Sequence, residues 1–210
     1  MLVSTTKRAD RVVLNNISWE QFESLLTLLG ERPTSRISYN QGTLEIMTPL
    51  PEHEYYIDTI SDAIKDIAET LGQDYECYGS TTWKRKLKEA GVEPDNCFYF
   101  QNESKVRGKL ELNLDIDPPP DLAIEVDLTN KSLNRFPIYA RLGVPEIWTY
   151  EQGKLTLYQL QNNATYQAAN QSLVLPSLPI QELPNLIEKY RNQGRIALRK
   201  AVRKWATDQR

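Results

Sequence analysis

PPDLAIEVDLT, at residues 119–129, is the stretch that decides the fold. Within it, LAIEVDL at 122–128 is apolar except for Glu125 and Asp127. A nearly continuous apolar run of this length is typical of a strand that is buried on both faces of a sheet. Side chains two residues apart lie on the same face of a strand. Because burying unpaired charge is costly, this pair of carboxylates needs a chemical or a structural reason.

Helical and strand patterns alternate around this run. The sequence predicts helices at 18–29, from about Pro51 to Leu71, in FPIYARL at 136–142 and, as one long helix, at roughly 181–207. It predicts strands at 75–83, 97–101 and 146–150, a hairpin around Asn40-Gln41-Gly42 that ends at Pro49, and a second hairpin in KLTLYQL...ATYQA from residue 154. This order favours an α/β fold, with a mixed β-sheet flanked by helices, an N-terminal helix and hairpin, and a long C-terminal helix.

Length and composition fit one ordinary globular domain. The chain has 210 residues, 40% hydrophobic and 25% charged, and we expect a single domain with its core at about 36–160 and a C-terminal helical extension at about 180–208. The first residues lack the apolar core of a signal peptide, and no run of about 18 apolar residues occurs. We therefore expect a cytoplasmic protein without a membrane partner.

The composition also limits the chemistry. Two cysteines and one histidine, His53, cannot form a Cys/His zinc cluster, and no glycine-rich phosphate loop indicates an organic cofactor. The formal net charge of -3 gives no overall attraction to nucleic acid, so a polyanion would need a local basic patch.

Three carboxylates form the candidate site. Asp95 opens one predicted strand, while Glu125 and Asp127 lie on the central one. If the two strands are neighbours, the three side chains present oxygen ligands to a hard cation such as Mg²⁺ or Mn²⁺. Such a cation activates water and neutralises charge on a phosphodiester. The alternative is that these carboxylates lie at strand ends in water or pair with nearby Lys and Arg.

Four segments resemble the putative restriction endonuclease family of the PD-(D/E)XK nuclease superfamily. They are LEIMTPLPEHE at 44–54, EPDNCFYFQN at 93–102, PPDLAIEVDLT at 119–129 and FPIYARLGVPEIW at 136–148, which follow the family's order over about half of the chain. The resemblance implies a restriction-endonuclease-like core in which Asp95 and Glu125 are the two acidic half-motif residues. It also implies a metal-ligating carboxylate from the preceding helix at Glu54 and a histidine at His53.

The chain departs from the superfamily pattern at position 127. The pattern has a lysine two residues after the second acid, where it orients the attacking water, and this chain has Asp127. Asp127 could be a third metal ligand, with the cationic role passed to Lys131 or Arg135; arginine is no equivalent of lysine, because it stays protonated. His53 is a candidate general base, with a capping role as the alternative.

Two other acidic residues are weaker candidates. Asp121 begins the central strand, but its spacing of four from Glu125 favours a position beyond the site. Glu45 lies on the first hairpin, where it could reach the site or pair with Arg36; we favour the structural role.

The leading hypothesis is a Mg²⁺-dependent endonuclease that hydrolyses DNA by metal-activated water. A catalytically inactive nuclease fold that binds nucleic acid or a protein is the alternative, motivated by Asp127. Basic residues in a turn at 84–88 and in the last helix could contact phosphates, or could simply form solvated faces. In the last helix an apolar stripe offers a third reading, a scaffold that docks on the domain or on a second copy to form a homodimer.

Overall fold

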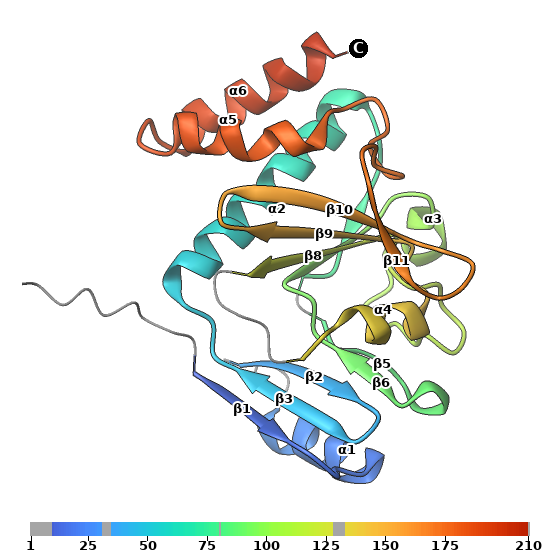
Figure 1. Ribbon diagram of the computed structural model, residues 1–210. Helices are drawn as coiled ribbons and strands as arrows, with labels where there is room; N and C mark the ends of the chain where they lie inside the picture. The colour runs from blue at the N-terminus through green and yellow to red at the C-terminus, as the bar shows by residue number, and fades with distance from the viewer. Residues whose placement is uncertain (1–9, 31–34, 80, 128–132, 210) are drawn as a thin grey trace, which may run out of the picture.

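The computed structural model describes residues 10–30, 35–79, 81–127 and 133–209. Two sheets lie one beside the other (Figure 1). The N-terminal sheet is antiparallel, in the order β1-β3-β2-β6-β5, and the central sheet has the order β11-β10-β9-β8-β7-β4. Only β8 and β9 pair in parallel among the described strands of the central sheet, so the predicted mixed sheet is confirmed.

The element bounds are as follows. The N-terminal sheet contains β1 (Arg11–Leu14), β2 (Arg36–Asn40), β3 (Thr43–Met47), β5 (Trp83–Arg85) and β6 (Ala90–Val92). The central sheet contains β4 (Glu76–Cys77), β7 (Asn96–Tyr99), β8 (Leu122–Asp127), β9 (Glu146–Glu151), β10 (Lys154–Leu160) and β11 (Tyr166–Ala169). The helices are α1 (Trp19–Leu29), α2 (Pro51–Leu71), α3 (Glu103–Val106), α4 (Phe136–Leu142), α5 (Leu183–Tyr190) and α6 (Arg195–Asp208), with short 3₁₀ turns η1 (Lys86–Lys88) and η2 (Ile180–Glu182).

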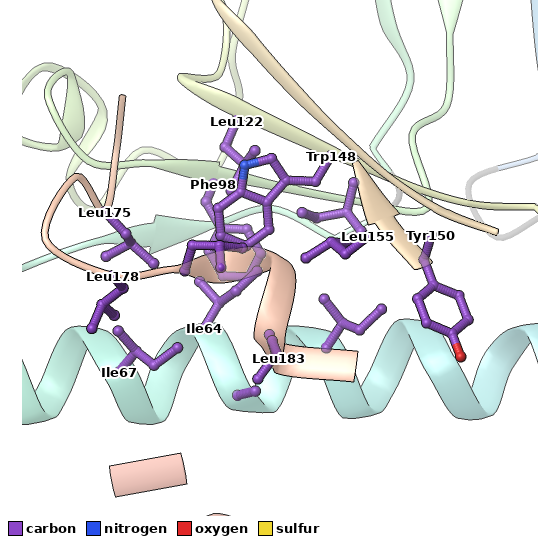
Figure 2. Packing of buried hydrophobic residues seen from close by; sticks show 14 of the residues in the cluster. Ile64, Ile67, Phe98, Leu122, Trp148, Tyr150, Leu155, Leu175, Leu178 and Leu183 are labelled. Carbon is purple, nitrogen blue, oxygen red and sulfur yellow. The ribbon is translucent and has the colours of Figure 1, made fainter. Parts of the chain in front are cut away.

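Strand β8 lies inside the central sheet with all six residues buried, as its apolar sequence predicts. Alternate side chains serve two cores. Leu122, Ile124 and Val126 join the core formed with α2 and the C-terminal helices, whereas Ala123 joins the core formed with α4. In Figure 2, Ile64 and Ile67 of α2 point toward Phe98, Leu122 and Trp148 of the sheet. Glu125 and Asp127 therefore belong to the α4 face.

The N-terminal sheet has an apolar face and a charged face. Its apolar face packs on α1, where Phe22 stacks on Tyr39 with ring centroids 4.7 Å apart. Gly91 permits this contact, because a Cβ atom there would lie 2.7 Å from the Phe22 ring. Alternation places Arg36 and Glu45 on the opposite face, which turns toward the central sheet.

Three predictions from the sequence need correction. The C-terminal helix is divided into α5 and α6, because Gly194 has φ +87°, which a continuing helix does not allow. The predicted strand at 75–83 contributes β4 to one sheet and β5 to the other, with Gly79 at φ +59° between them. The basic turn after it is the β5-η1-β6 hairpin. None of the helices among the described residues is both long and apolar enough to cross a bilayer.

Candidate active site

Asp95 and Glu125 are brought together where β7 begins and β8 ends. The backbone N–H of Asp95 donates to the carbonyl of Ile124 at 3.1 Å, and its Oδ2 accepts from the backbone N–H of Val126 at 2.7 Å. Asp95 thus binds the residues on both sides of Glu125. The two side chains are 1% and 3% exposed. The adjacent strands on which the hypothesis depends are therefore present, and they hold a buried pair of carboxylates.

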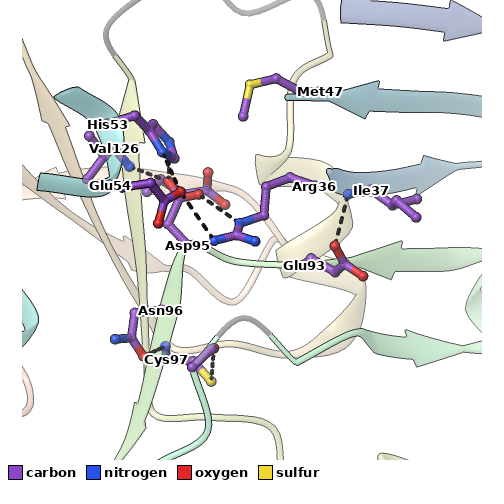
Figure 3. Close-up of polar contacts among 12 residues, drawn as sticks. Arg36, Ile37, Met47, His53, Glu54, Glu93, Asp95, Asn96, Cys97 and Val126 are labelled. Carbon is purple, nitrogen blue, oxygen red and sulfur yellow. Dashed lines mark hydrogen bonds and ion pairs between the residues drawn. The ribbon is translucent and has the colours of Figure 1, made fainter. Parts of the chain in front are cut away.

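His53 and Arg36 flank the Asp95 carboxylate (Figure 3). Nε2 of His53, in the first turn of α2, lies 3.1 Å from Oδ2, and Nε of Arg36 lies 3.7 Å from Oδ1. Burial raises the pKa of Asp95, but contact with His53 and the charges of His53 and Arg135 outweigh burial and hold the pKa below its usual range. Asp95 is therefore a carboxylate rather than a carboxylic acid near neutral pH.

The pKa of His53 moves in the opposite direction. Burial of the ring lowers it, but contact with Asp95 and the charges of Asp95, Glu54 and Glu125 outweigh burial, so the pKa lies above its ordinary value. A raised pKa favours the imidazolium form. His53 is thus better suited to be a positively charged partner of Asp95 than the neutral base that the sequence suggested.

Glu54 lies at the rim of this cluster. Its side chain is 49% exposed, 3.5 Å from Nδ1 of His53 and 3.6 Å from Nη2 of Arg36. The helix therefore supplies a carboxylate near Asp95, as the family resemblance implies. It reaches Asp95 through the two cationic groups.

Arg135 and Tyr139 hold the Glu125 carboxylate. Nη1 of Arg135 lies 2.5 Å from Oε2, and the Tyr139 hydroxyl donates to Oε1. Burial lowers the pKa of Arg135, but the charges of Glu125 and Asp95 outweigh burial and raise it. Burial and the charge of Glu125 also raise the pKa of Tyr139. Glu125 is therefore bound by one permanent cation and one neutral hydroxyl.

Glu45 reaches the site through Arg135. Its side chain is 2% exposed, and it lies 3.6 Å from Nη2 of Arg135 and 3.6 Å from Nε of Arg11. Glu45 thus borders the site and forms ion pairs with Arg11 and Arg135, whereas the partner predicted from the sequence, Arg36, pairs with Glu54 and Asp95.

The remaining predicted residues lie as follows. Asp127 ends β8, 9% exposed, on the same face as Glu125. Lys131 lies outside the described residues, and its catalytic role stays a prediction. Asp121 lies at the other end of β8 from Asp127, where it accepts from the backbone N–H groups of Phe100 and Asn102 and so fixes the loop after β7. Of the two residues proposed for the cationic role of the missing lysine, Arg135 lies next to Glu125.

Two site residues were missed from the sequence. Tyr139 lies four residues after Arg135 on α4, a spacing that places both on one helix face. Arg36 comes directly before Ile37 on β2. Neighbouring side chains of a strand point to opposite faces, and Ile37 and Tyr39 lie on the apolar face, so the pattern places Arg36 on the other face. The local pattern thus carried a signal for each, but their acidic partners are distant in sequence.

Both basic regions are tied to neighbouring acids. In the hairpin, Lys84 lies 3.0 Å from Glu23 and Lys86 lies 3.3 Å from Glu20 of α1. In α6, Arg195, Arg199 and Arg203 pair with acidic residues of α2, namely Asp58, Asp66 and Glu69. Leu198 and Val202 are buried in the same contact. The last helix therefore docks on its own domain, which was one of the readings of its sequence.

Two buried carboxylates therefore lie at the junction of a mixed sheet and a helix, in keeping with the nuclease family that the sequence resembles. The model of the Uma2 family, described as putative restriction endonuclease, matches residues 19–189. The match covers most of the chain, which therefore belongs to this family, and the resemblance seen in the sequence is confirmed.

Among solved structures, the chain is similar to the crystal structure of a putative nuclease belonging to DUF820 from Anabaena variabilis ATCC 29413. The identity is 13% and the TM-score is 0.49, with 86% of this chain and 96% of that chain covered. No curated protein matches the chain.

Proposed function

We propose that this protein hydrolyses DNA phosphodiester bonds with the help of Mg²⁺ or Mn²⁺ at Asp95 and Glu125. The observation that carries the proposal is the position of Asp95, which binds the backbone on both sides of Glu125 and so holds the two residues next to each other at the start of β7 and the end of β8. Membership of a family described as putative restriction endonuclease supports phosphodiester hydrolysis as the reaction and DNA as the substrate.

The carboxylates of the site offer oxygen ligands that fit a divalent cation. Oδ1 of Asp95 is buried and accepts no hydrogen bond from the described residues, so it is an oxygen ligand in need of a partner. Within the described ranges, no group of three or more His, Cys, Asp or Glu side chains forms a ready cage. Mg²⁺ commonly binds through one or two carboxylates together with water and substrate phosphate, so two carboxylates fit it.

Asp95 and Glu125 would hold the cation, with Asp127 and Glu54 as candidates for further ligands. A bound Mg²⁺ would supply charge neutralisation on the phosphodiester and a lower pKa for the attacking water. The ordered position of Asp95 means that little of the carboxylate's freedom has to be lost when substrate arrives.

The cationic side chains have separate tasks in this proposal. Arg135 stays protonated and is suited to bind a phosphate oxygen, but it cannot accept the proton of the attacking water. His53, with its raised pKa, holds Asp95 as a carboxylate. The proton of the attacking water therefore leaves to solvent or to a carboxylate. Lys131 remains a candidate to orient that water.

One observation favours a second candidate function. Each buried carboxylate already has a cationic neighbour from the chain, Arg36 and His53 at Asp95 and Arg135 at Glu125. A cluster that is neutralised by its own side chains suits a non-catalytic nuclease fold that binds nucleic acid or a protein. The docking of α6 on α2 gives less support to a scaffold that assembles through the last helix.

A plasmid assay tests the proposal. Wild-type protein is incubated with supercoiled DNA and Mg²⁺ or Mn²⁺, and nicking is followed on gels with an EDTA control. We expect Asp95→Asn and Glu125→Gln each to lower the rate about a hundredfold or more, since each removes a charge that the transition state uses.

Asp66→Asn is the matched control, because it removes a buried carboxylate that pairs with arginines outside the site. Its rate should equal that of wild type. Equal cleavage by all variants would exclude the site, and absence of cleavage by folded wild type on any DNA would favour the non-catalytic alternative.

A further inference from the structure

Arg135 occupies a position that a metal ion would share. It lies at the N-terminal boundary of α4 with its side chain 7% exposed, 2.5 Å from Glu125 and 3.6 Å from Glu45. Its charge also acts on Asp95. A guanidinium so placed neutralises the same carboxylates that would hold a dication. Two cationic groups that use one carboxylate oxygen oppose each other's binding.

The charges of the described cluster are nearly balanced without a metal ion. Glu45, Asp95 and Glu125 are its buried carboxylates, with Glu54 at the rim, and Arg11, Arg36, Arg135 and His53 are cationic groups that face them. A dication added to this set would make the buried cluster strongly positive. Either a cationic side chain leaves its carboxylate or an anion enters with the metal.

The phosphodiester substrate is such an anion. Arginine binds phosphate oxygens with the same paired N–H groups that it uses for carboxylates. If Arg135 moves from Glu125 to a phosphate, Glu125 loses a positive neighbour that opposes the cation, and the incoming phosphate adds negative charge. The substrate would then improve the affinity for the metal, and the metal would improve the affinity for the substrate by the same factor.

We propose that Arg135 is a resident counter-ion of Glu125 which competes with the divalent cation and yields its place when a phosphodiester binds. This inference rests on the proposed function, since it takes Asp95 and Glu125 as the metal ligands. Arg135 thereby links metal binding to substrate binding. The free protein is kept in a state with low affinity for metal, and this affinity rises when a phosphodiester binds.

Binding of Mn²⁺ to the full chain tests this directly. The free ion is measured by electron paramagnetic resonance during titration of wild type and of Arg135→Gln, without DNA. Gln keeps hydrogen-bonding capacity and removes the charge, so we expect it to bind Mn²⁺ about tenfold more tightly. Arg135→Lys keeps the charge and should stay close to wild type. Arg199→Gln, outside the site, should equal wild type.

A second measurement uses wild type alone and decides the matter if Arg135→Gln does not fold. Dimethyl phosphate, a minimal phosphodiester anion, should tighten Mn²⁺ binding, whereas the neutral trimethyl phosphate should not. Where both proteins fold, this gain should be smaller in Arg135→Gln. Failure of dimethyl phosphate to change the Mn²⁺ affinity of wild type would overturn the coupling.

The outcomes separate this inference from the proposed function. Equal Mn²⁺ affinity of wild type and Arg135→Gln, with binding lost in Glu125→Gln, would overturn the competition and leave the metal site standing. If neither wild type nor Arg135→Gln binds Mn²⁺, with or without dimethyl phosphate, the metal site itself is excluded and both proposals fail.

Discussion

Two carboxylate–arginine clusters of this molecule look alike in a list of ion pairs and differ in their surroundings. Asp66 of α2 is fully buried, but its partners Arg199 and Arg203 are 45% and 48% exposed. At the candidate site, Glu125 and Arg135 are 3% and 7% exposed. Arginines that reach water lose little hydration when they pair, whereas a fully buried pair loses most of it. A wholly buried ionic cluster is therefore a costly arrangement that points to function.

The two clusters also differ in how completely their carboxylate oxygens are hydrogen-bonded. The Asp66 oxygens accept from Arg199 and Arg203 at 2.8–2.9 Å, a complete set of charge-assisted hydrogen bonds. Oδ1 of Asp95 has no hydrogen-bond donor among the described residues, although Arg36 lies 3.7 Å away. The first arrangement fastens α6 to α2. The second leaves a carboxylate oxygen without a hydrogen-bond donor, which is expected of a binding site and not of a purely structural ion pair.

The largest expected difference concerns the loss of one arginine. Arg135→Met should lower the free energy of unfolding by about 3–5 kcal/mol, because Glu125 and Glu45 stay buried without their shared cation. Arg199→Met should cost about 1 kcal/mol or less, since Arg203 still pairs with Asp66 and water reaches both arginines. Urea unfolding followed by circular dichroism measures both. Similar losses would show that burial does not distinguish the clusters.

Removal of the Asp66 charge should have an intermediate effect. Asp66→Asn leaves Arg199 and Arg203 without their shared carboxylate, and we expect a loss of about 1–2 kcal/mol, reduced by the exposure of both arginines. Thermal unfolding of this variant should show a lower midpoint. A midpoint equal to that of wild type would mean that the other contacts of α6, such as those of Leu198 and Val202, are sufficient to hold it in place.

The smallest expected effect is a change with pH in the stability that the Asp66 carboxylate provides. Burial raises the pKa of Asp66, but hydrogen bonds from Arg199 and Arg203 outweigh burial and keep it below its usual range. A lowered folded-state pKa gives stability that is fully present above the unfolded-state pKa, about 3.9, and is lost as the pH falls through the folded-state value. The stability difference between wild type and Asp66→Asn should therefore be constant from about pH 5 to 7 and shrink below about pH 4. A constant difference down to pH 2 would contradict the lowered pKa.

The sequence predicted the elements that local pattern determines. The β8 run and the helix from Pro51 to Leu71 were confirmed because burial on both faces and a repeated apolar stripe leave few alternatives. The division of the strands between two sheets was not predicted, since pairing of β2 with β6 depends on residues some fifty positions apart. The interruption before Gly194 was missed because helical periodicity continues through it.

The candidate site shows the same limit. Asp95 and Glu125 were chosen from short motifs, and the structure places them together. The cations that neutralise them come from β2, α2 and α4, and a motif in one segment does not identify its partners in another. The sequence offers Arg135 as a substitute for the missing lysine, but its ion pairs with Glu125 and Glu45 follow only from the tertiary arrangement.

Helix α2 contributes residues to both clusters. It carries His53 in its first turn and Asp66 thirteen residues later, which is about 20 Å along its axis. One helix therefore bears an imidazole at the candidate site and the carboxylate that holds α6. Trimming the chain from its end would remove the packing of α6 from the same helix that carries His53. A loss of cleavage in such a deletion would therefore not by itself assign a chemical role to the removed residues.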